Sequence, residues 1–223
     1  MSRARKEAST EQIISVVLDL LESEGYEAVQ LREVARRAHM SLATVYSRFA
    51  TRDELIVAAI ERWMARNSYA ALEQPRAGET LHDGLMRVLG YVFEPWERNP
   101  RMLEAYHRAR TGAGGERLDA QGISAILPVA AALFEGADPT YIEDVALILA
   151  NMAYAVIGRF ADHSLEITDI LPTLERAVFR LTSDNASAAA AATSSTSRPD
   201  GEAFSVDPSL AAPFNPPADE PER

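Results

Sequence analysis

The sequence predicts an all-α protein. Apolar residues recur three or four positions apart through most of the chain, as they do on one face of a helix. No stretch shows the strict alternation of apolar and polar residues that is typical of a β-strand. Helix-start residues such as Thr51 and Asp138 precede the periodic segments. We therefore expect short helices in the N-terminal third and longer, more apolar helices beyond Pro75.

The sequence of the N-terminal third predicts four helices. A capping-box pattern at Ser9 and Gln12 starts the first, and Gly25 ends it. Thr51 and Glu54 form a second capping box, which opens a long helix. The second helix is expected over residues 31–38, the third runs to about residue 49, and the fourth covers 53 to about 72.

Prolines organise the predicted helices of the C-terminal part. Pro95, followed by Asn99 and Pro100, is expected to end one helix, and Pro128 to kink or break another. Asp138 before Pro139 is a helix start, with an N-cap residue and a proline in the first turn. The expected ranges are 81–96, 101–110, 117–134, 139–162 and about 168–181.

Composition excludes several classes of protein. The chain of 223 residues has no cysteine, which rules out disulfides, Cys-based zinc sites and thiol nucleophiles. Its N-terminus lacks the apolar segment of a signal peptide. The longest nearly apolar run, residues 145–157, has 13 residues, fewer than the roughly 20 of a bilayer span. We therefore expect a soluble, cytoplasmic protein with no membrane partner.

Charge is distributed unevenly along the chain. The formal net charge is −11, yet residues 1–66 carry 10 Lys+Arg and 10 Asp+Glu. Between Arg32 and Arg52, five arginines accompany a single acid, Glu33. A local basic patch on an acidic protein can bind a polyanion. The alternative is an arginine face that is merely solvated.

The stretch HMSLATVYSRF, residues 39–49, is suited to binding DNA. Two short helices joined by a short turn have the proportions of a helix-turn-helix. Tyr46 and Arg48 can donate to phosphate oxygens, and Arg52 adds charge at the start of the next helix. The other outward residues include no acid; they are Ala43, Thr44 and Ser47. A plain helical hairpin is the alternative.

Residues 10–66 resemble the N-terminal domain of the TetR family of bacterial repressors. The stretch GYEAVQLREVARRAHMSLATVYSRFATRDEL is similar to the family signature in register across three helices. The resemblance implies an all-helical homodimer whose helix-turn-helix units bind a palindromic operator in double-stranded DNA. The signature positions are Gly25, Tyr26, Val34, Ala35, Ser41, Thr44, Val45, Tyr46, Phe49, Arg52 and Leu55. The residues expected at the DNA are Gln30, Arg32, Ser41, Leu42, Ala43, Thr44, Tyr46, Ser47, Arg48 and Arg52.

Three positions depart from the family pattern. Gln30 stands where a helix-capping threonine is usual. Ala43 replaces a common glycine, and Arg48 replaces a common histidine or tyrosine. Docking on DNA is still expected, but the operator sequence does not follow from the resemblance.

The last two predicted helices are expected to form the dimer interface. Residues 144–160 are apolar nearly all round, so this helix must be covered on both sides. The final helix repeats leucine and valine at coiled-coil-like spacing. The expected interface residues are Ile148, Val156, Leu171, Leu174, Val178 and Leu181. A core closed within one chain is the alternative.

The middle helices carry a set of methionines and aromatic residues that suits an adaptable apolar cavity. Ordinary core packing is the alternative. The expected ligand-binding residues are Met86, Leu89, Val92, Phe93, Trp96, Met102, Tyr106, Leu127, Asn151 and Met152. The segment WERNPRMLEAYHRA is also similar to the actinobacterial repressors of cholesterol catabolism. That likeness implies a bulky apolar effector, such as an acyl-CoA thioester of a steroid or fatty acid.

The sequence favours a ligand-responsive transcriptional repressor. We expect a helix-turn-helix domain over residues 1–55, a larger C-terminal helical ligand-binding and dimerisation domain over 56–182, and a disordered tail over 183–223. Neither a cofactor nor a catalytic site is expected, and the four histidines lack metal-ligand spacing. The alternatives are a constitutive architectural DNA-binding dimer without an effector, and a helical enzyme.

Overall fold

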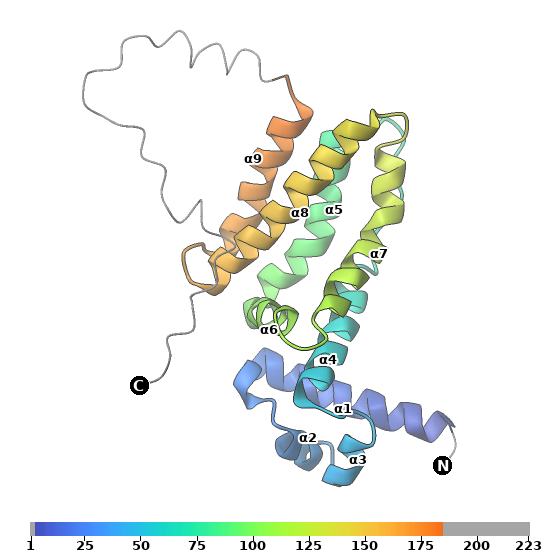
Figure 1. The fold of residues 1–223 in the computed structure, drawn as a ribbon, viewed down its shortest axis with the longest axis vertical. Helices are drawn as coiled ribbons and strands as arrows, with labels where there is room; N and C mark the ends of the chain where they lie inside the picture. Colours follow the sequence, from blue (N-terminus) through green and yellow to red (C-terminus); the bar gives the residue numbers. More distant parts are fainter. Residues whose placement is uncertain (1–2, 185–223) are drawn as a thin grey trace, which may run out of the picture.

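The computed structural model describes residues 3–184, with side chains from residue 6 onward. Over this range the protein is all-α, as predicted (Figure 1). The elements are α1 (Arg3–Ser23), η1 (Tyr26–Ala28), α2 (Leu31–Arg37), α3 (Leu42–Tyr46), α4 (Arg52–Asn67), α5 (Leu81–Arg98), α6 (Pro100–Arg110), α7 (Glu116–Leu133), α8 (Pro139–Ala161), η2 (Ile167–Asp169) and α9 (Ile170–Thr182). Apart from residues 183 and 184, the predicted disordered tail lies outside the described residues.

The N-terminal helices α1, α2 and α3 pack with the start of α4 at the lower end of the molecule (Figure 1). Their apolar faces meet at residues such as Leu20, Val34 and Val45, which are fully buried. The start predicted at Ser9 is wrong, because α1 already begins at Arg3. The preceding Arg, Ala, Lys and Glu residues are strong helix formers, so the helix extends through Ser9.

Helix α4 connects the two ends of the molecule. It packs on α1 in the lower part and on α6 and α7 above. Thr51 caps it as predicted, accepting from the Glu54 amide at 3.0 Å, while the Glu54 carboxylate accepts from the Ala50 amide at 2.7 Å. Buried apolar residues form one continuous cluster from Ile13 in α1 to Leu174 in α9. The two ends therefore share one hydrophobic core.

Helices α5, α7, α8 and α9 stand side by side in the upper part (Figure 1). Helix α5 packs on α7 and α9, and α8 packs on α9 and α6. Asp138 caps α8 as predicted, accepting from the Tyr141 amide at 3.1 Å. By length and composition alone α8 could cross a membrane, a property that core helices of soluble proteins share. Within residues 3–184, the side chains of Leu147 and Ile148 on this helix stay exposed.

The break predicted as one possibility at Pro128 does not occur, and the helix that contains Pro95 ends two residues later than predicted, directly before Asn99 and Pro100. Helix α7 runs unbroken through Pro128, and α5 continues past Pro95 to Arg98. A proline removes one backbone donor and frees a carbonyl one turn earlier. At Pro128 both the proline and Ser124 are exposed, so water can satisfy the freed carbonyl.

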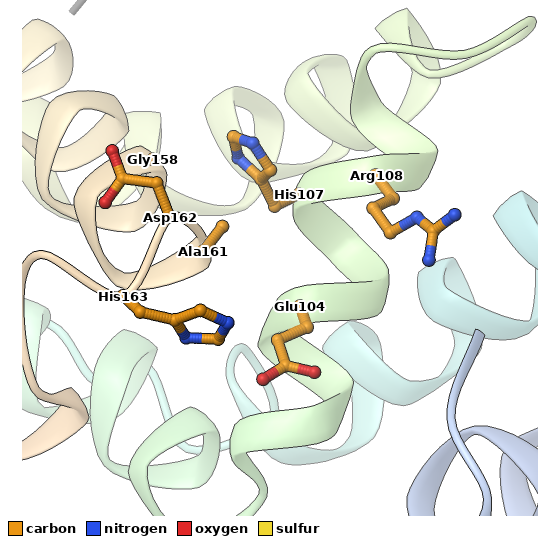
Figure 2. Close-up of a pocket in the computed structure, with 7 residues that line it drawn as sticks. All are labelled: Glu104, His107, Arg108, Gly158, Ala161, Asp162 and His163. Atoms are coloured by element: carbon orange, nitrogen blue, oxygen red, sulfur yellow. The ribbon is translucent and has the colours of Figure 1, made fainter.

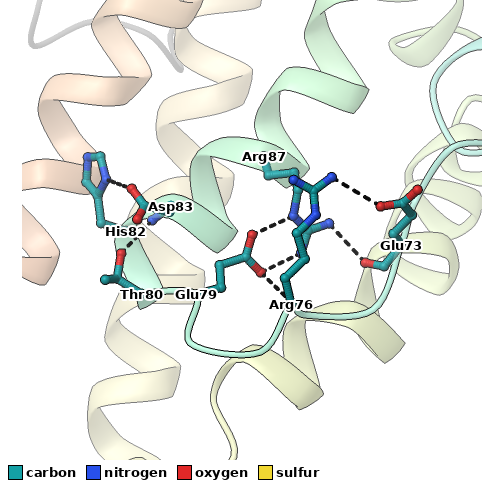
Figure 3. Close-up of polar contacts among 7 residues, drawn as sticks. All are labelled: Glu73, Arg76, Glu79, Thr80, His82, Asp83 and Arg87. Carbon is teal, nitrogen blue, oxygen red and sulfur yellow. Dashed lines mark hydrogen bonds and ion pairs between the residues drawn. The ribbon is translucent and has the colours of Figure 1, made fainter.

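A polar network fixes the connection between α4 and α5 (Figure 3). The Arg87 guanidinium donates to both carboxylate oxygens of Glu79, at 2.7 and 2.8 Å, and to the carbonyl of Glu73 at 3.0 Å. Both charged side chains are largely buried. The hydrogen bonds from Arg87 and from the Arg76 amide lower the pKa of Glu79 to about 2. This connection begins at Ser68 and Tyr69, so the network holds in place the chain that follows α4.

Candidate DNA-binding surface and apolar cavity

The predicted recognition helix is α3, a helix of five residues. Ser41 caps it by accepting from the Thr44 amide at 3.1 Å, and the hydroxyls of Ser41 and Thr44 lie 2.8 Å apart. The Ser47 hydroxyl donates to the Thr44 carbonyl at 2.7 Å. Val45 and Phe49 are buried beneath the helix. Hydrogen bonds thus fix the small polar side chains of α3, and buried apolar side chains support the helix from below.

The outward face of this helix-turn-helix carries most of the residues predicted at DNA. Tyr46 is 51% exposed. Leu42, Thr44 and Arg48 are half-buried, and the exposed members of the set are Gln30, Arg32, Ser41, Ala43 and Ser47. Gln30 donates to the Glu27 carbonyl at 3.2 Å and makes no side-chain cap on α2, consistent with the missing threonine. Such a surface can meet a phosphate backbone without acidic repulsion.

The five arginines of the basic patch do not share one environment. Glu33 binds both Arg36 and Arg37, and these hydrogen bonds lower the pKa of its carboxyl to about 2. Arg32 and Arg48 have no carboxylate partner among residues 3–184. Arg48 donates to the Ser47 hydroxyl at 3.1 Å, while its buried Nε has no partner in this range.

The expectation for Arg52 requires a correction. Its guanidinium turns back under η1, where it donates to the backbone carbonyls of Tyr26, at 2.7 Å, and Val29. It also stacks on the Tyr26 ring, 4.6 Å from the ring centroid. A carbonyl-rich turn attracts a cation, so Arg52 holds η1 to α4 and is not directed at DNA.

An apolar cavity of about 340 Å³ lies among α4, α5, α6, α7 and α8. Six of the predicted ligand-binding residues line it: Leu89, Val92, Phe93, Trp96, Tyr106 and Leu127. Ile123 and Leu127 on α7 are both 61% exposed although they line the cavity, so its mouth opens beside α7. Volume and lining suit a small apolar molecule.

Four predicted ligand-binding residues do not line the cavity. Met102 is fully buried in the continuous core, and Met152 packs against that core from outside. Met86 packs in a smaller cluster with Leu85 and Val145. Asn151 is exposed and donates to the Leu147 carbonyl at 2.7 Å, one turn back along α8. Periodicity alone could not distinguish these faces, because every helix here has more than one apolar neighbour.

A polar cluster at one end of the cavity was missed, apart from Tyr106. Asp119 of α7 accepts from the Tyr106 hydroxyl at 3.4 Å, the Tyr154 hydroxyl at 3.3 Å and Arg110 Nε at 2.9 Å. Tyr69 lines the same cavity. Burial is the main cause of the raised pKa of the Tyr69, Tyr106 and Tyr154 hydroxyls. These residues come from four elements far apart in sequence, so no local motif marks them.

A second, polar pocket of about 310 Å³ lies where α6 faces the end of α8 (Figure 2). Its lining includes Glu104, His107, Asp162 and His163. Burial and the nearby Arg110 lower the pKa of His107, against the opposing effect of Asp162. Within residues 3–184, no group of three or more His, Cys, Asp or Glu side chains could hold a metal ion.

Helix α6 also joins the upper helices to the predicted DNA-binding domain. Arg108 forms an ion pair with Glu27 and stacks on the Tyr26 ring, 4.4 Å from its centroid. Arg101 donates to the Ser23 carbonyl at the end of α1. Tyr26 thus carries two arginine contacts, one from α4 and one from α6. These contacts join α6 directly to η1 and to the end of α1, next to the helix-turn-helix.

The predicted dimer residues divide into two groups. Val156, Leu174 and Val178 are buried within this chain, so they cannot provide the outer face of an interface. Leu171 and Leu181 are half-buried. Ile148 is 45% exposed, beside Leu147 at 64%, and Phe179 on α9 is 51% exposed. The uncovered apolar surface therefore involves residues one position away from several of those predicted.

Both parts of the chain match models of one family. Residues 13–59 match "Bacterial regulatory proteins, tetR family", and residues 78–181 match "Tetracyclin repressor-like, C-terminal domain". Together these matches cover more than half of the chain. The chain belongs to the TetR family. The TetR-family matches take in the second half of α1, α2, α3 and the first half of α4 on one side, and α5 to α9 on the other.

Curated relatives of this TetR-family chain include two repressors. The HTH-type transcriptional repressor KstR of Mycolicibacterium smegmatis is 36% identical over 112 residues, covering 48% of this chain and 52% of the relative. KstR of Mycobacterium tuberculosis is 32% identical over 108 residues, covering 48% and 49%. The chain thus spans about half the length of the curated relatives it matches. The resemblance to repressors of this type, expected from the sequence, is confirmed.

Solved structures show the same TetR-family fold. A TetR transcriptional regulator from Rhodococcus sp. RHA1 superposes with a TM-score of 0.61 at 21% identity, over 76% of this chain and 95% of that one. A TetR-like regulator from the same organism gives 0.54 at 22% identity, over 81% and 97%. At this identity the likeness concerns the fold alone.

Proposed function

We propose that the protein is a cytoplasmic transcriptional repressor that binds a palindromic operator as a homodimer and is released by a bulky apolar effector. The observation that carries the proposal is the pairing of an acid-free helix-turn-helix face with an apolar cavity in one continuous core. In this reading residues 1–55 bind DNA, residues 56–182 bind the effector and dimerise, and residues 183–223 form a tail that neither activity requires.

Dimerisation through α8 and α9 is supported by their exposed apolar side chains. Leu147, Ile148 and Phe179 lie on two helices that pack on each other. Covering them with the same helices of a second copy would give a four-helix interface. Apolar area removed from water stabilises such an association by about 25 cal/mol per Å² before its entropic costs.

Effector binding would act on DNA through α6. The helix lines the cavity with Tyr106, and its next turn contacts η1 through Arg108. An effector that favours a different position of α6 would change the spacing of the two recognition helices in the dimer. Linkage then requires that operator DNA weaken effector binding by the same factor. An acyl-CoA thioester of a steroid or fatty acid is one candidate effector.

The test is an operator-release titration. Duplexes selected from a random pool by the protein supply the operator, and acyl-CoAs, free steroids and fatty acids are titrated against the complex. The effector reading predicts release by at least one apolar compound. A cavity-filling variant, Ala130→Trp, should blunt release while leaving DNA affinity near normal, because Ala130 lines the cavity far from α3.

The main competing function is a constitutive DNA-binding dimer without an effector. The cavity disfavours it, since packed cores leave few voids larger than a water molecule. If no compound in the panel shifts DNA binding in wild type, the constitutive dimer becomes the better account. The families that the chain matches are transcriptional regulators, which weighs against an enzyme.

A further inference from the structure

The polar end of the cavity offers one unused acceptor. All three donors to Asp119 meet the same carboxylate oxygen, Oδ1. Within residues 3–184 its second oxygen, Oδ2, has no hydrogen-bond partner, and Asp119 lines the cavity. An ionised carboxylate has about four acceptor positions, so the cluster leaves capacity for a donor supplied from the cavity.

The same end offers one unused donor. The Tyr69 hydroxyl lines the cavity and makes no hydrogen bond to the part of the protein that the structure describes. Tyr69 lies beside the turn of α7 that carries Asp119, because its hydroxyl approaches Gly122, three residues further along the same helix. Tyr69 is half-buried, so its hydroxyl is free to donate to a ligand that enters the cavity and accepts from it.

Space beside this donor exists because residue 122 is a glycine. A Cβ at Gly122 would lie 3.0 Å from the Tyr69 hydroxyl oxygen. That distance is tighter than ordinary van der Waals contact, so any side chain here would displace the ring or close the space. Gly122 is itself part of the cavity lining.

The side chains at the polar end of the cavity together carry almost no net charge. Arg110 pairs with Asp119 and lies over the Tyr154 ring, 3.9 Å from its centroid. The tyrosines are uncharged at neutral pH, because burial raises the pKa of each. An incoming carboxylate would meet Asp119, and an incoming ammonium would meet Arg110. Burying either charge without a full partner is unfavourable.

We propose that the cavity selects apolar molecules that end in a neutral hydroxyl, with Tyr69 and Asp119 as the residues that determine this specificity. The ligand hydroxyl donates to Asp119 Oδ2 and accepts from Tyr69 Oη, so both unused groups are satisfied at once. A ketone can accept from Tyr69 but leaves Asp119 Oδ2 unpaired. The proposal rests on the proposed function only in taking this cavity as the effector site.

The experiment compares decanol, 2-decanone, decanoate and decylamine, which share one apolar chain and differ at its end. Binding to the full-length protein is followed by tryptophan fluorescence, since Trp96 lines the cavity and the chain has only two tryptophans. Titration calorimetry gives a second readout. We expect decanol to bind tightest, the ketone several-fold more weakly, and both charged compounds at least tenfold more weakly.

Three variants test whether Tyr69 and the space beside Gly122 determine the affinity for decanol. Tyr69→Phe should lower decanol affinity about three- to tenfold, the value of one hydrogen bond, and change decanoate binding little. Gly122→Ala, which fills the space beside Tyr69 at a helical position, should lower decanol affinity as well. Tyr91→Phe is the matched control, because Tyr91 lies on α5 outside the cavity lining. Circular dichroism checks that each variant is folded.

Two results would overturn the proposal. One is decanoate, decylamine or the ketone binding as tightly as decanol, or no member of the series binding at all. The other is a folded Tyr69→Phe variant with unchanged decanol affinity. Operator release is measured on the same samples. If decanol binds with the expected ranking while DNA stays bound, the ligand specificity stands and the repressor mechanism fails.

Discussion

On the surface of α3, hydroxyl groups bind one another before any DNA is present. The Ser41 hydroxyl meets the Thr44 hydroxyl, and Ser47 donates to the Thr44 carbonyl. The Thr44 hydroxyl is thus already engaged with Ser41, and it keeps one further hydrogen-bonding position. Tyr46, by contrast, has an exposed side chain, and Arg48 lies beside it. These residues differ in what they can contribute: Tyr46 and Arg48 suit phosphates, and Thr44 suits base recognition.

The first prediction separates these two contributions. Tyr46→Ala and Arg48→Ala should weaken binding to every duplex, whereas Thr44→Ala should weaken the selected operator specifically, by about 1–3 kcal/mol. Fluorescence anisotropy against operator and scrambled duplexes measures both. Affinity of the wild type should fall as salt rises, because phosphate contacts release counterions. A flat salt dependence would exclude DNA binding through this surface.

A buried ion pair in the connection before α5 gives the second prediction. Arg87 lowers the pKa of Glu79 to about 2, from an ordinary value near 4.5. A carboxyl whose pKa is lowered by folding stabilises the native state above its unfolded pKa, and this contribution is lost as pH falls through the folded value. The stability advantage of wild type over Glu79→Gln should therefore be full above about pH 5 and shrink towards pH 2.

Urea unfolding of both proteins across this pH range measures the difference. Glu73→Gln, on the same connection but more exposed, is the control and should show a weaker dependence. A constant difference between wild type and Glu79→Gln at all pH values would contradict the ion-pair account.

At the scale of elements, helix α6 contacts the cavity through Tyr106 and η1 through Arg108. Its Arg108 reaches Glu27 and Tyr26, and Tyr26 is held from the other side by Arg52. Each exposed contact of this kind is worth about 1 kcal/mol or less. That is small against the stability of a domain but comparable to a typical allosteric coupling of about 1–3 kcal/mol.

The third prediction follows from this comparison. Arg108→Ala should reduce the ratio of operator affinities without and with effector by about threefold or more, while unfolding stability changes by less than about 2 kcal/mol. Arg98→Ala is the control, since Arg98 pairs with Glu94 on its own helix and is largely exposed. Anisotropy with and without the effector found in the release panel provides the measurement. An unchanged ratio would mean that coupling runs by another route.

The sequence predicted the number and order of the longer helices because helical periodicity and capping residues are local signals. Thr51 and Asp138 cap the helices they were expected to cap. The wrong predictions concern positions whose conformation depends on tertiary contacts or on exposure to solvent. Pro128 stays within α7 because it and Ser124, whose carbonyl it frees, are exposed to solvent. Arg52 turns inward because η1 presents carbonyls to it. The cluster around Asp119 was missed because it is assembled from distant segments.

At the scale of the whole molecule, α8 and α9 carry apolar side chains that residues 3–184 leave exposed. The fourth prediction is that Leu147→Glu combined with Ile148→Glu converts a homodimer to a monomer, because two charges would be buried at its centre. Analytical ultracentrifugation measures the mass of the particle in solution. Loss of the dimer should also lower the affinity for the operator. Ala131→Glu, at an exposed position on α7, is the control. A monomeric wild type, or a double variant that stays dimeric, would disprove this interface.

The arginines of α6 also bear on how regulators of this type can be recombined. Arg101 donates to the Ser23 carbonyl and Arg108 pairs with the Glu27 carboxylate, so the contact between the two halves depends on the arginines of α6 and on residues 23–27. A chimera that takes its first 55 residues from another regulator would keep both helix-turn-helix and cavity. It would retain communication between them only if the donor supplies an aromatic ring and an acid at positions 26 and 27. A chimera therefore responds to the ligand only if the contacts between α6 and residues 23–27 are preserved, even where each half folds well.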